Sequence, residues 1–340
     1  MADTWDNSDV AALLAKSGLP REFRVANLSG GGNNRVYRLD CDGSSLLLKA
    51  YFHHPDDPHD RLAAEFSFSQ FAWDHGLRCI PQPLARDDRK HLGLYEFIRG
   101  RALEPVEVGA DAVDQAVAFF VELNRHRRDP MADHLPNGSE ACFTLEEHLA
   151  CVQCRIARLA RVEGTSPLDR EAAAWIRDKL HPTWQRVRAN VEQQAAAGGL
   201  AFTEPIQAMD RCLSPSDFGF HNAILAEDSR LRFVDFEYAG WDDPAKTVCD
   251  FLCQPKLAVP ELHAGRFAQA VVSGLSDAAV HAWRISLLLP VYRLKWCCIM
   301  MNDFLPLASQ RRAFAQAGGQ EERKRMQLEK ADQALQRIKE

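Results

Sequence analysis

The sequence predicts an α+β protein of two lobes: a small, mainly antiparallel sheet with one inserted helix, followed by a larger and mostly helical lobe. The chain has 340 residues, which is long for one small domain and suits two lobes. Residues 22–98 carry short β-type runs between turn signals, whereas later residues are apolar mainly at helical spacing. We therefore expect lobes of residues 1–98 and 99–340.

Five strand-like runs and two helices account for the first lobe. Residues 8–17 predict a short helix with Ser8 as its N-cap. The letters CDG at residues 41–43 predict a hairpin turn, and residues 59–76 predict the inserted helix. The five predicted strands cover residues 22–29, 34–41, 44–52, 79–88 and 90–100.

The second lobe shows helix signals that short strands interrupt. Thr144 and Glu147 predict a capping box at the start of one helix. Pro290 predicts a kink or a break in a later helix. Residues 223–227 and 231–236 predict two short strands. Residues 320–340 predict an exposed, charged C-terminal helix.

Composition and charge narrow the class of protein. Hydrophobic residues make up 46% of the chain and charged residues 26%, as in ordinary globular proteins. The net charge of -6 gives no electrostatic reason to expect nucleic acid or an anionic membrane as a partner. The N-terminus lacks the apolar core of a signal peptide, and basic residues interrupt the most apolar stretch, residues 284–301. We therefore expect a cytoplasmic protein.

The ten cysteines are expected to be reduced thiols. Cys151 and Cys154 form a CxxC pattern that raises a zinc or redox site as an alternative, but no second pair accompanies them. They lie in an amphipathic stretch, so packing within a helix is the favoured interpretation. The same interpretation applies to Cys249, Cys253, Cys297 and Cys298.

Two features of the first lobe suit phosphate binding. Gly30, Gly31 and Gly32 lie between predicted strands, where backbone N–H groups can approach a phosphate closely. A simple hairpin turn is the alternative. Lys49 lies in an apolar strand and Glu65 in the following helix, so the carboxylate could hold the lysine near a polyphosphate. The alternative is that both side chains face solvent.

Three oxygen-bearing side chains in the second lobe suit a metal-assisted phosphoryl transfer. Asp217 precedes Asn222 by five residues, and Asp235 ends the apolar run LRFVDF. A loop carboxylate can orient a hydroxyl or accept its proton, and carboxylate and amide oxygens suit Mg²⁺. Turn or cap chemistry is the alternative for each residue alone. The fixed order of glycine turn, strand lysine, helix glutamate and these three residues favours the catalytic interpretation.

This order resembles the protein-kinase-like fold, and more closely the aminoglycoside phosphotransferase and choline kinase group. SPSDFGFHN at residues 214–222 is similar to the group's HGDxxxxN loop, and FVDFEYAGWDDP at residues 233–244 to its IDF or IDWE segment. Residues 79–103 are similar to its strand–hinge segment, and the resemblance covers residues 20–255. It implies a bilobal protein-kinase-like fold and an ATP-dependent kinase that phosphorylates a hydroxyl of a small molecule.

The resemblance also implies roles for individual residues. Lys49 would bind the ATP phosphates and pair with Glu65, Asp217 would be the catalytic aspartate, and Asn222 and Asp235 would hold Mg²⁺. The other residues expected to bind the nucleotide are Gly30, Gly31, Gly32, Asn33, Glu96, Phe97 and Ile98, the last three through backbone groups presented to adenine. The implied reaction is in-line transfer of the γ-phosphoryl group.

Three positions depart from the group's pattern. Pro215 and Gly219 occupy the places of its two loop histidines, and a histidine stands at His221 instead. Thr247 stands where an aspartate usually follows the letters DP, and Asp250 comes a helical turn later. The metal and base residues are intact, so these changes bear on how the loop is braced.

Glu237, Trp241 and Asp242 are the candidates for contact with the acceptor. Carboxylates beside aromatic faces suit a cationic amine, which favours an amino-alcohol, an aminoglycoside or an amino sugar. Acidic loops are usually only solvated, however, and a neutral sugar or nucleoside-like alcohol fits nearly as well. The acceptor, the choice of ATP or GTP and the oligomeric state all stay open at this point.

Two other functions compete with the small-molecule kinase. A nucleotide-binding pseudokinase, acting as a regulatory or scaffold module, is suggested by the missing loop histidine, but Lys49, Asp217, Asn222 and Asp235 are all present. A protein kinase would need room for a long activation segment and an APE motif after Asp235, and the chain has little such room and no such motif.

Overall fold

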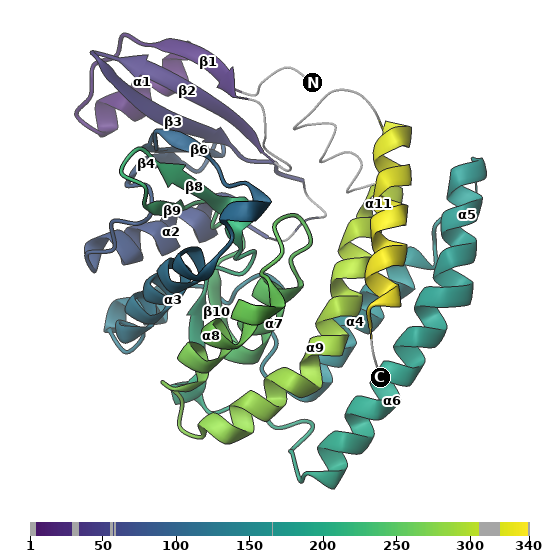
Figure 1. Ribbon diagram of the computed structural model, residues 1–340. Helices are drawn as coiled ribbons and strands as arrows, with labels where there is room; N and C mark the ends of the chain where they lie inside the picture. Colours follow the sequence, from purple (N-terminus) through teal and green to yellow (C-terminus); the bar gives the residue numbers. More distant parts are fainter. Residues whose placement is uncertain are drawn as a thin grey trace.

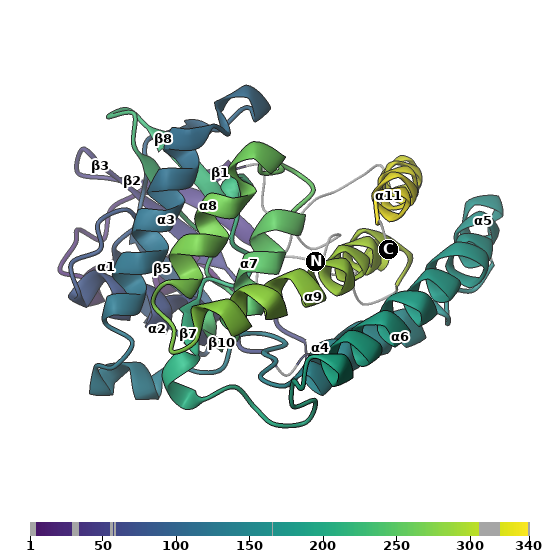
Figure 2. The same ribbon diagram turned by 60° about the horizontal axis from the view of Figure 1, so that its bottom comes forward.

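The computed structural model describes residues 5–28, 34–54, 57, 59–164, 166–305 and 320–338. It has the predicted α+β architecture, with a five-stranded antiparallel sheet in the first lobe and a mainly helical second lobe. Figure 1 shows the sheet at one end of the molecule and the helices α5, α6, α9 and α11 at the other. In the view of Figure 2, α5 and α6 extend away from the sheet.

The five-stranded sheet has the order β1-β2-β3-β5-β4, and each neighbouring pair is antiparallel. Asp42 and Gly43 join β2 to β3 with φ values of 45° and 76°. This confirms the predicted hairpin turn, which needs left-handed backbone at both positions. The elements of this lobe beyond α1 are β1 (Arg24–Leu28), β2 (Arg35–Cys41), β3 (Ser44–Ala50), α2 (Arg61–Asp74), β4 (Pro83–Asp87) and β5 (Leu92–Glu96).

One face of this sheet is covered by α1 (Asn7–Lys16), and the other opens toward the second lobe. Leu39 and Leu48 are fully buried in the apolar cluster beneath α1. The prediction that Ser8 is the N-cap was wrong: the helix is capped by Asp6, whose carboxylate accepts hydrogen bonds from backbone N–H groups of the first turn. A carboxylate two residues earlier reaches these donors better than the serine does.

The second lobe is built mainly from α-helices. Thr144 caps α4 through the reciprocal hydrogen bonds of a capping box, as predicted. One turn of π-helix, Ile176–Leu180, joins α5 to α6. The α-helices are α3 (Ala110–Arg125), α4 (Leu145–Leu159), α5 (Pro167–Trp175), α6 (His181–Ala197), α7 (Pro244–Cys253), α8 (Glu261–Val272), α9 (Ala278–Met300) and α11 (Gln320–Gln336). Short 3₁₀ turns lie at Pro105–Glu107, Pro130–His134, Ala208–Asp210, Phe220–Asn222 and Met301–Phe304.

Two small sheets lie on the second-lobe side of the junction between the lobes. Strand β6, which follows the first-lobe sheet in the sequence, pairs with the β8–β9 hairpin, and β7 pairs with β10. The chain therefore passes from one lobe to the other between Glu96 and Gly100. The strands are β6 (Gly100–Ala102), β7 (Cys212–Ser214), β8 (Ala223–Ala226), β9 (Leu231–Phe233) and β10 (Gly240–Asp242).

Helix α9 excludes one of the two outcomes predicted at Pro290, a break, and helix α11 differs from its prediction. Helix α9 continues through Pro290 without a break, because its packing against α4, α7 and α11 outweighs the lost backbone hydrogen bond. Figure 1 shows the helix changing direction along its length. Helix α11 is not simply exposed: Leu328, Ala331 and Leu335 form a narrow apolar stripe that is buried.

All ten cysteines are free thiols. Cys249, Cys297 and Cys298 are buried as expected, whereas Cys154 is exposed, so the packing interpretation is wrong for that residue. Within the described residues, no three His, Cys, Asp or Glu side chains are grouped so that they could hold a metal ion. Of the helices that the structure describes, none is long and apolar enough to cross a membrane.

Candidate active site

Lys49 is the centre of a buried ion cluster between the lobes. Its ammonium donates to Glu65 Oε2 and to Asp235 Oδ1, each at 2.6 Å. Burial alone would lower the pKa of Lys49, but the charges of Asp235 and Glu65 outweigh burial and hold this pKa well above its ordinary value. Burial raises the pKa of Glu65 to about 7 although the charge of Lys49 opposes that change. The predicted pairing of Lys49 with Glu65 thus has the geometry of a direct ion pair.

A cleft of about 440 Å³ lies between the first-lobe sheet and the β8–β9 hairpin, and Lys49 lines it. The strand register explains the wall that the sheet forms, because Leu28, Val36 and Lys49 are paired in one row across β1, β2 and β3. Apolar surfaces on both sides of a slot suit the flat base of a nucleotide. The aliphatic side chains that line the slot include Leu28, Val36, Leu47, Ile224 and Val234.

The residues predicted to bind the nucleotide fall into two groups. Glu96, Phe97 and Ile98 line the cleft where the chain passes between the lobes. Residues 30–33, the glycine turn and Asn33, lie outside the described residues. Asn34, which follows them, is buried and donates to Glu237 Oε2 at 2.5 Å. The chain is therefore anchored to the second lobe directly after the predicted glycine turn.

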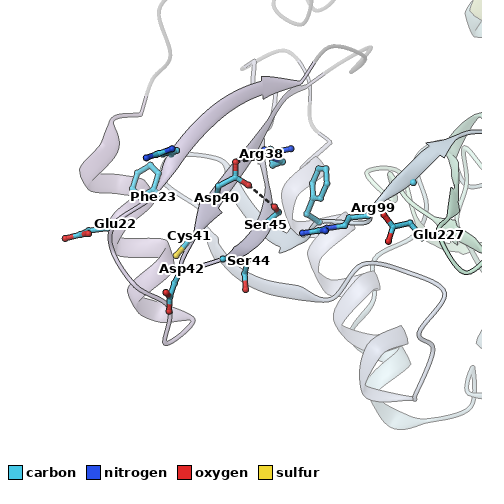
Figure 3. A pocket seen from close by; sticks show the side chains of 14 residues that line it. Glu22, Phe23, Arg38, Asp40, Cys41, Asp42, Ser44, Ser45, Arg99 and Glu227 are labelled. Atoms are coloured by element: carbon cyan, nitrogen blue, oxygen red, sulfur yellow. Dashed lines mark hydrogen bonds and ion pairs between the residues drawn. The ribbon is translucent and has the colours of Figure 1, made fainter.

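A second, more polar hollow of about 900 Å³ adjoins the cleft at Phe97. Its wall includes Arg24, Asp40 and Ser45, which are paired in another row across β1, β2 and β3. Asp40 accepts hydrogen bonds from Ser45 at 2.8 Å and from Arg38 at 2.7 Å (Figure 3). On the face of the sheet that lines the cleft, side chains thus change from apolar to charged along the strands. The apolar slot ends where the charged row begins.

Asp217 lies in the loop between β7 and β8, where its neighbours in the sequence hold it. Asn222 donates through its side chain to the backbone carbonyl of Asp217 at 3.0 Å, and His221 Nε2 lies 3.3 Å from Asp217 Oδ1. Phe218 and Phe220 are buried in the core, whereas the Asp217 side chain is 35% exposed. Burial would raise the pKa of Asp217, but the hydrogen bond and charge of His221 outweigh it and lower this pKa.

Neutral hydroxyl groups brace this loop. Thr247 on α7 donates to Ser214 Oγ at 2.9 Å, and the same oxygen accepts from the backbone N–H of Ser216 at 3.0 Å. Ser216 has a φ of 62°, a left-handed conformation that turns the chain directly before the aspartate. Asp250, one helical turn after Thr247, pairs instead with Lys295 at 2.8 Å. The loop is therefore held by neutral hydroxyls, without the two histidines and the aspartate of the group's pattern.

Asn222 and Asp235 lie side by side at the end of the β8–β9 hairpin that faces the cleft. The backbone N–H of Val234 donates to the carbonyl of Asn222 at 2.9 Å, and both side chains line the cleft. Asp235 has a φ of 69°, which is costly for most residues and which aspartate tolerates better than most. One carboxylate and one amide oxygen at an open cleft fit Mg²⁺, which takes few protein ligands and keeps several waters.

The sequence also matches a known family over most of this region. Residues 24–252, more than half of the chain, match the model of the phosphotransferase enzyme family. The chain belongs to this family. No curated protein matches it.

Solved structures of similar fold include two choline kinases and a spectinomycin phosphotransferase. The choline kinase of Cryptosporidium parvum has a TM-score of 0.59 at 11% identity, over 97% of this chain and 98% of that one. The choline kinase LicA of Streptococcus pneumoniae has a TM-score of 0.60 at 13% identity, over 97% of each chain. The spectinomycin phosphotransferase, in complex with ADP and spectinomycin, has a TM-score of 0.59 at 13% identity, over 97% of this chain and 98% of that one. These likenesses show the kinase-like fold of the family.

Of the three candidate acceptor residues, Glu237 and Asp242 are buried inside the fold, whereas Trp241 is half-buried. Asp242 is fully buried and paired with Lys246, so it has no surface with which to contact an acceptor. Trp241 donates its indole N–H to a backbone carbonyl at 2.9 Å. Glu237 is buried, and its carboxylate lies 3.8 Å from Arg61 Nε. The acidic segment therefore ties parts of the fold together, which the spacing of its letters does not reveal.

Three residues of this phosphotransferase site had no role in the sequence-based assignment. Tyr51 comes two residues after Lys49, so the two-residue period of a strand places it on the same face, and its hydroxyl donates to Glu65 at 2.8 Å. His221 directly precedes the predicted metal ligand, and a 3₁₀ turn brings it to Asp217, the predicted catalytic aspartate. No sequence signal marks Tyr95, because only the pairing of β3 with β5 brings it near Tyr51.

Proposed function

We propose that this phosphotransferase is an ATP-dependent kinase that transfers the γ-phosphoryl group to a hydroxyl of a small molecule. The observation that carries the proposal is the pairing of Lys49 with both Glu65 and Asp235 at the edge of an apolar slot. Phosphate oxygens can replace the carboxylate of Asp235 at the ammonium, while Glu65 keeps the lysine in place. This arrangement suits a nucleoside triphosphate whose base occupies the slot.

In this mechanism Asp217 orients the acceptor hydroxyl and takes its proton late in the transfer. Its lowered pKa keeps the carboxylate ionised and able to accept that proton, and His221 holds one of its oxygens. Lys49 offsets the negative charge of the phosphates. Asn222 and Asp235 would hold Mg²⁺. When bound, Mg²⁺ supplies further stabilisation of the charge on the phosphate oxygens.

The proposed acceptor is a small hydroxylated compound: an amino-alcohol, an aminoglycoside or a sugar. Choline and spectinomycin, the acceptors in the names of the three similar proteins described above, belong to this chemical range. The carboxylates of Glu237 and Asp242 are used inside the fold, so they do not favour a cationic acceptor over a neutral one. An acceptor screen should therefore include uncharged sugars as well as amines.

A nucleotide-binding pseudokinase is the alternative. The reason to consider it was the missing loop histidine, but the hydroxyls of Ser214 and Thr247 brace the loop in this chain. Lys49, Asn222 and Asp235 also line one cleft together. Both observations favour an enzyme over a pseudokinase.

The melting temperature with ATP, measured with and without Mg²⁺, tests the proposed site. ATP at about a hundred times its dissociation constant adds roughly 2.7 kcal/mol of stability. We expect an upward shift that Mg²⁺ enlarges and that Asp235→Ala abolishes. The control Asp228→Ala removes an exposed carboxylate from the turn between β8 and β9, so it should keep the shift. The absence of a shift with ATP and with GTP would contradict the nucleotide site.

Acceptor-dependent release of ADP then separates the kinase from the pseudokinase. We expect release to depend on a hydroxylated compound. A protein that binds Mg²⁺·ATP but releases ADP with no amine or sugar would instead support the pseudokinase.

A further inference from the structure

Two tyrosine hydroxyls extend the ion cluster of Lys49 into the sheet. The hydroxyl of Tyr51 donates at 2.8 Å to Glu65 Oε2, the oxygen that also accepts from Lys49. The hydroxyl oxygens of Tyr51 and Tyr95 are 2.8 Å apart. Because Tyr51 gives its single proton to the carboxylate, Tyr95 is the donor to Tyr51. The chain of hydrogen bonds therefore runs from Tyr95 through Tyr51 and Glu65 to Lys49.

These four side chains are enclosed by the protein. Each is at most 6% exposed, and the rings of Tyr51 and Tyr95 pack in one apolar cluster with Leu62. Burial raises the pKa of both tyrosines well above the ordinary value, so both keep their protons as donors. The rings are fixed by packing, and the hydroxyls are therefore held at defined positions.

The carboxylate of Glu65 depends on this chain for its orientation. In the part of the chain that the structure describes, the hydrogen bonds to Glu65 come from Lys49 and Tyr51. The terminal torsion of a glutamate is soft, so one donor alone leaves the carboxylate free to rotate. A rotation of Glu65 would move the oxygen that holds the lysine ammonium on one side, whereas Asp235 holds it on the other.

The chain of hydrogen bonds begins and ends at the cleft, because Tyr95 at one end and Glu65 and Lys49 at the other all line it. Tyr95 lines the cleft and directly precedes Glu96, where β5 ends. We propose that Tyr51 and Tyr95 are positioning residues that hold Glu65, and through it Lys49, in place for the phosphates of a bound nucleotide. This inference rests on the proposed nucleotide site.

Substitution by phenylalanine isolates the hydroxyl groups. The Tyr51 ring lies with its centroid 5.2 Å from Lys49 Nζ, and Tyr51→Phe keeps this contact while it removes the hydroxyl and its hydrogen bonds to Glu65 and Tyr95. Tyr95→Phe leaves Tyr51 able to donate but without its own donor. The larger effect is therefore expected at Tyr51.

The test is calorimetric titration of each variant with ADP plus Mg²⁺ and, separately, with adenosine. We expect Tyr51→Phe to weaken ADP binding about tenfold and Tyr95→Phe about threefold, because hydrogen bonds to charged groups are stronger than neutral ones. Adenosine has no phosphates, so its affinity should not change. The double variant should bind ADP about as weakly as Tyr51→Phe alone, because the two hydroxyls act in series.

A matched control and two further outcomes separate positioning from folding. Tyr37→Phe alters a buried tyrosine on the α1-covered face of the same sheet, so both affinities should stay unchanged. Equal losses for ADP and adenosine, or effects that multiply in the double variant, would overturn the positioning role. Unchanged ADP affinity in Tyr51→Phe would overturn it too. A wild-type protein that binds neither ligand would overturn the proposed function itself.

Discussion

The two sides of the candidate active site are held in place by different chemistry. In the first lobe, Lys49 is fixed by the carboxylates of Glu65 and Asp235 in a mostly buried cluster. In the second lobe, the loop that carries the proposed catalytic aspartate is fixed by neutral hydroxyls of Ser214 and Thr247. Removing one partner from a buried ion pair leaves an uncompensated charge, whereas one neutral hydrogen bond contributes about 1 kcal/mol. The phosphate side should therefore tolerate substitution far less than the brace of the loop.

The proposed catalytic carboxylate should give the largest effect on turnover. We expect Asp217→Asn to lower kcat by about 100- to 10,000-fold, because the acceptor hydroxyl loses its general base. The melting shift expected with Mg²⁺·ATP should persist, since Asp217 is not among the residues that line the proposed nucleotide cleft. Asp114→Asn, an exposed carboxylate on α3, serves as the control in the same ADP-release assay. Normal turnover in Asp217→Asn would contradict the proposed role of Asp217 as the general base.

Loss of the buried lysine should give the largest effect on stability. We expect Lys49→Met to lower the free energy of unfolding by about 3 kcal/mol, because Glu65 is left buried without its cation. Urea unfolding measures the change, with Lys16→Met at the exposed end of α1 as the control. A loss no larger than that of the control would show that the cluster is held in some other way.

The raised pKa of Glu65 predicts a pH dependence with a definite sign. Burial raises it from 4.5 to about 7, so the folded state binds this proton more tightly than the unfolded state. The contribution of Glu65 to stability is therefore fully present below pH 4.5 and is lost as the pH rises through about 7. Glu65→Gln cannot titrate, so its free energy of unfolding should fall less over this range than that of the wild type. Urea unfolding at several pH values measures both proteins, and an equal fall in the free energy of unfolding for the wild type and Glu65→Gln would contradict the prediction.

The hydroxyl brace should give the smallest effect. We expect Thr247→Val to cost about 1 kcal/mol of stability, because one neutral hydrogen bond to Ser214 is lost. Turnover should fall less than tenfold, since the backbone N–H of Ser216 still reaches Ser214. Ser273→Ala, which removes a hydroxyl bonded within the exposed end of α8, is the control for urea unfolding and for turnover. A loss of stability in Thr247→Val as large as that in Lys49→Met would contradict the claim that the hydroxyl brace tolerates substitution better than the ion cluster.

Local signals in the sequence predicted the elements that local chemistry decides. The turn at Asp42 and Gly43 and the cap at Thr144 follow from residue types at fixed positions. Lys49 could be identified because a charged residue in an apolar strand run is unusual. The place of Glu65 in the following helix made it the candidate partner, the family resemblance implied the same pairing, and the two residues form a direct ion pair.

Contacts between distant segments could not be predicted in this way. Asp242 was expected at the acceptor, but the pairing of β10 with β7 and the ion pair with Lys246 bury it. The brace between Thr247 and Ser214 joins residues that no periodic pattern relates. Pro290 was expected to kink or break its helix, and packing from other helices, among them α4, α7 and α11, excludes the break. Each of these depends on tertiary packing, which overrides local preference.

The most direct test of the central claim is the release of ADP from Mg²⁺·ATP by the wild-type protein, measured with a panel of amino-alcohols, aminoglycosides and sugars. The account predicts negligible release without an acceptor and a clear increase with at least one hydroxylated compound. It also predicts that this compound is recovered as its phosphate ester. Release at one unchanging rate, with or without every compound in the panel, would contradict the claim that the protein is a small-molecule kinase.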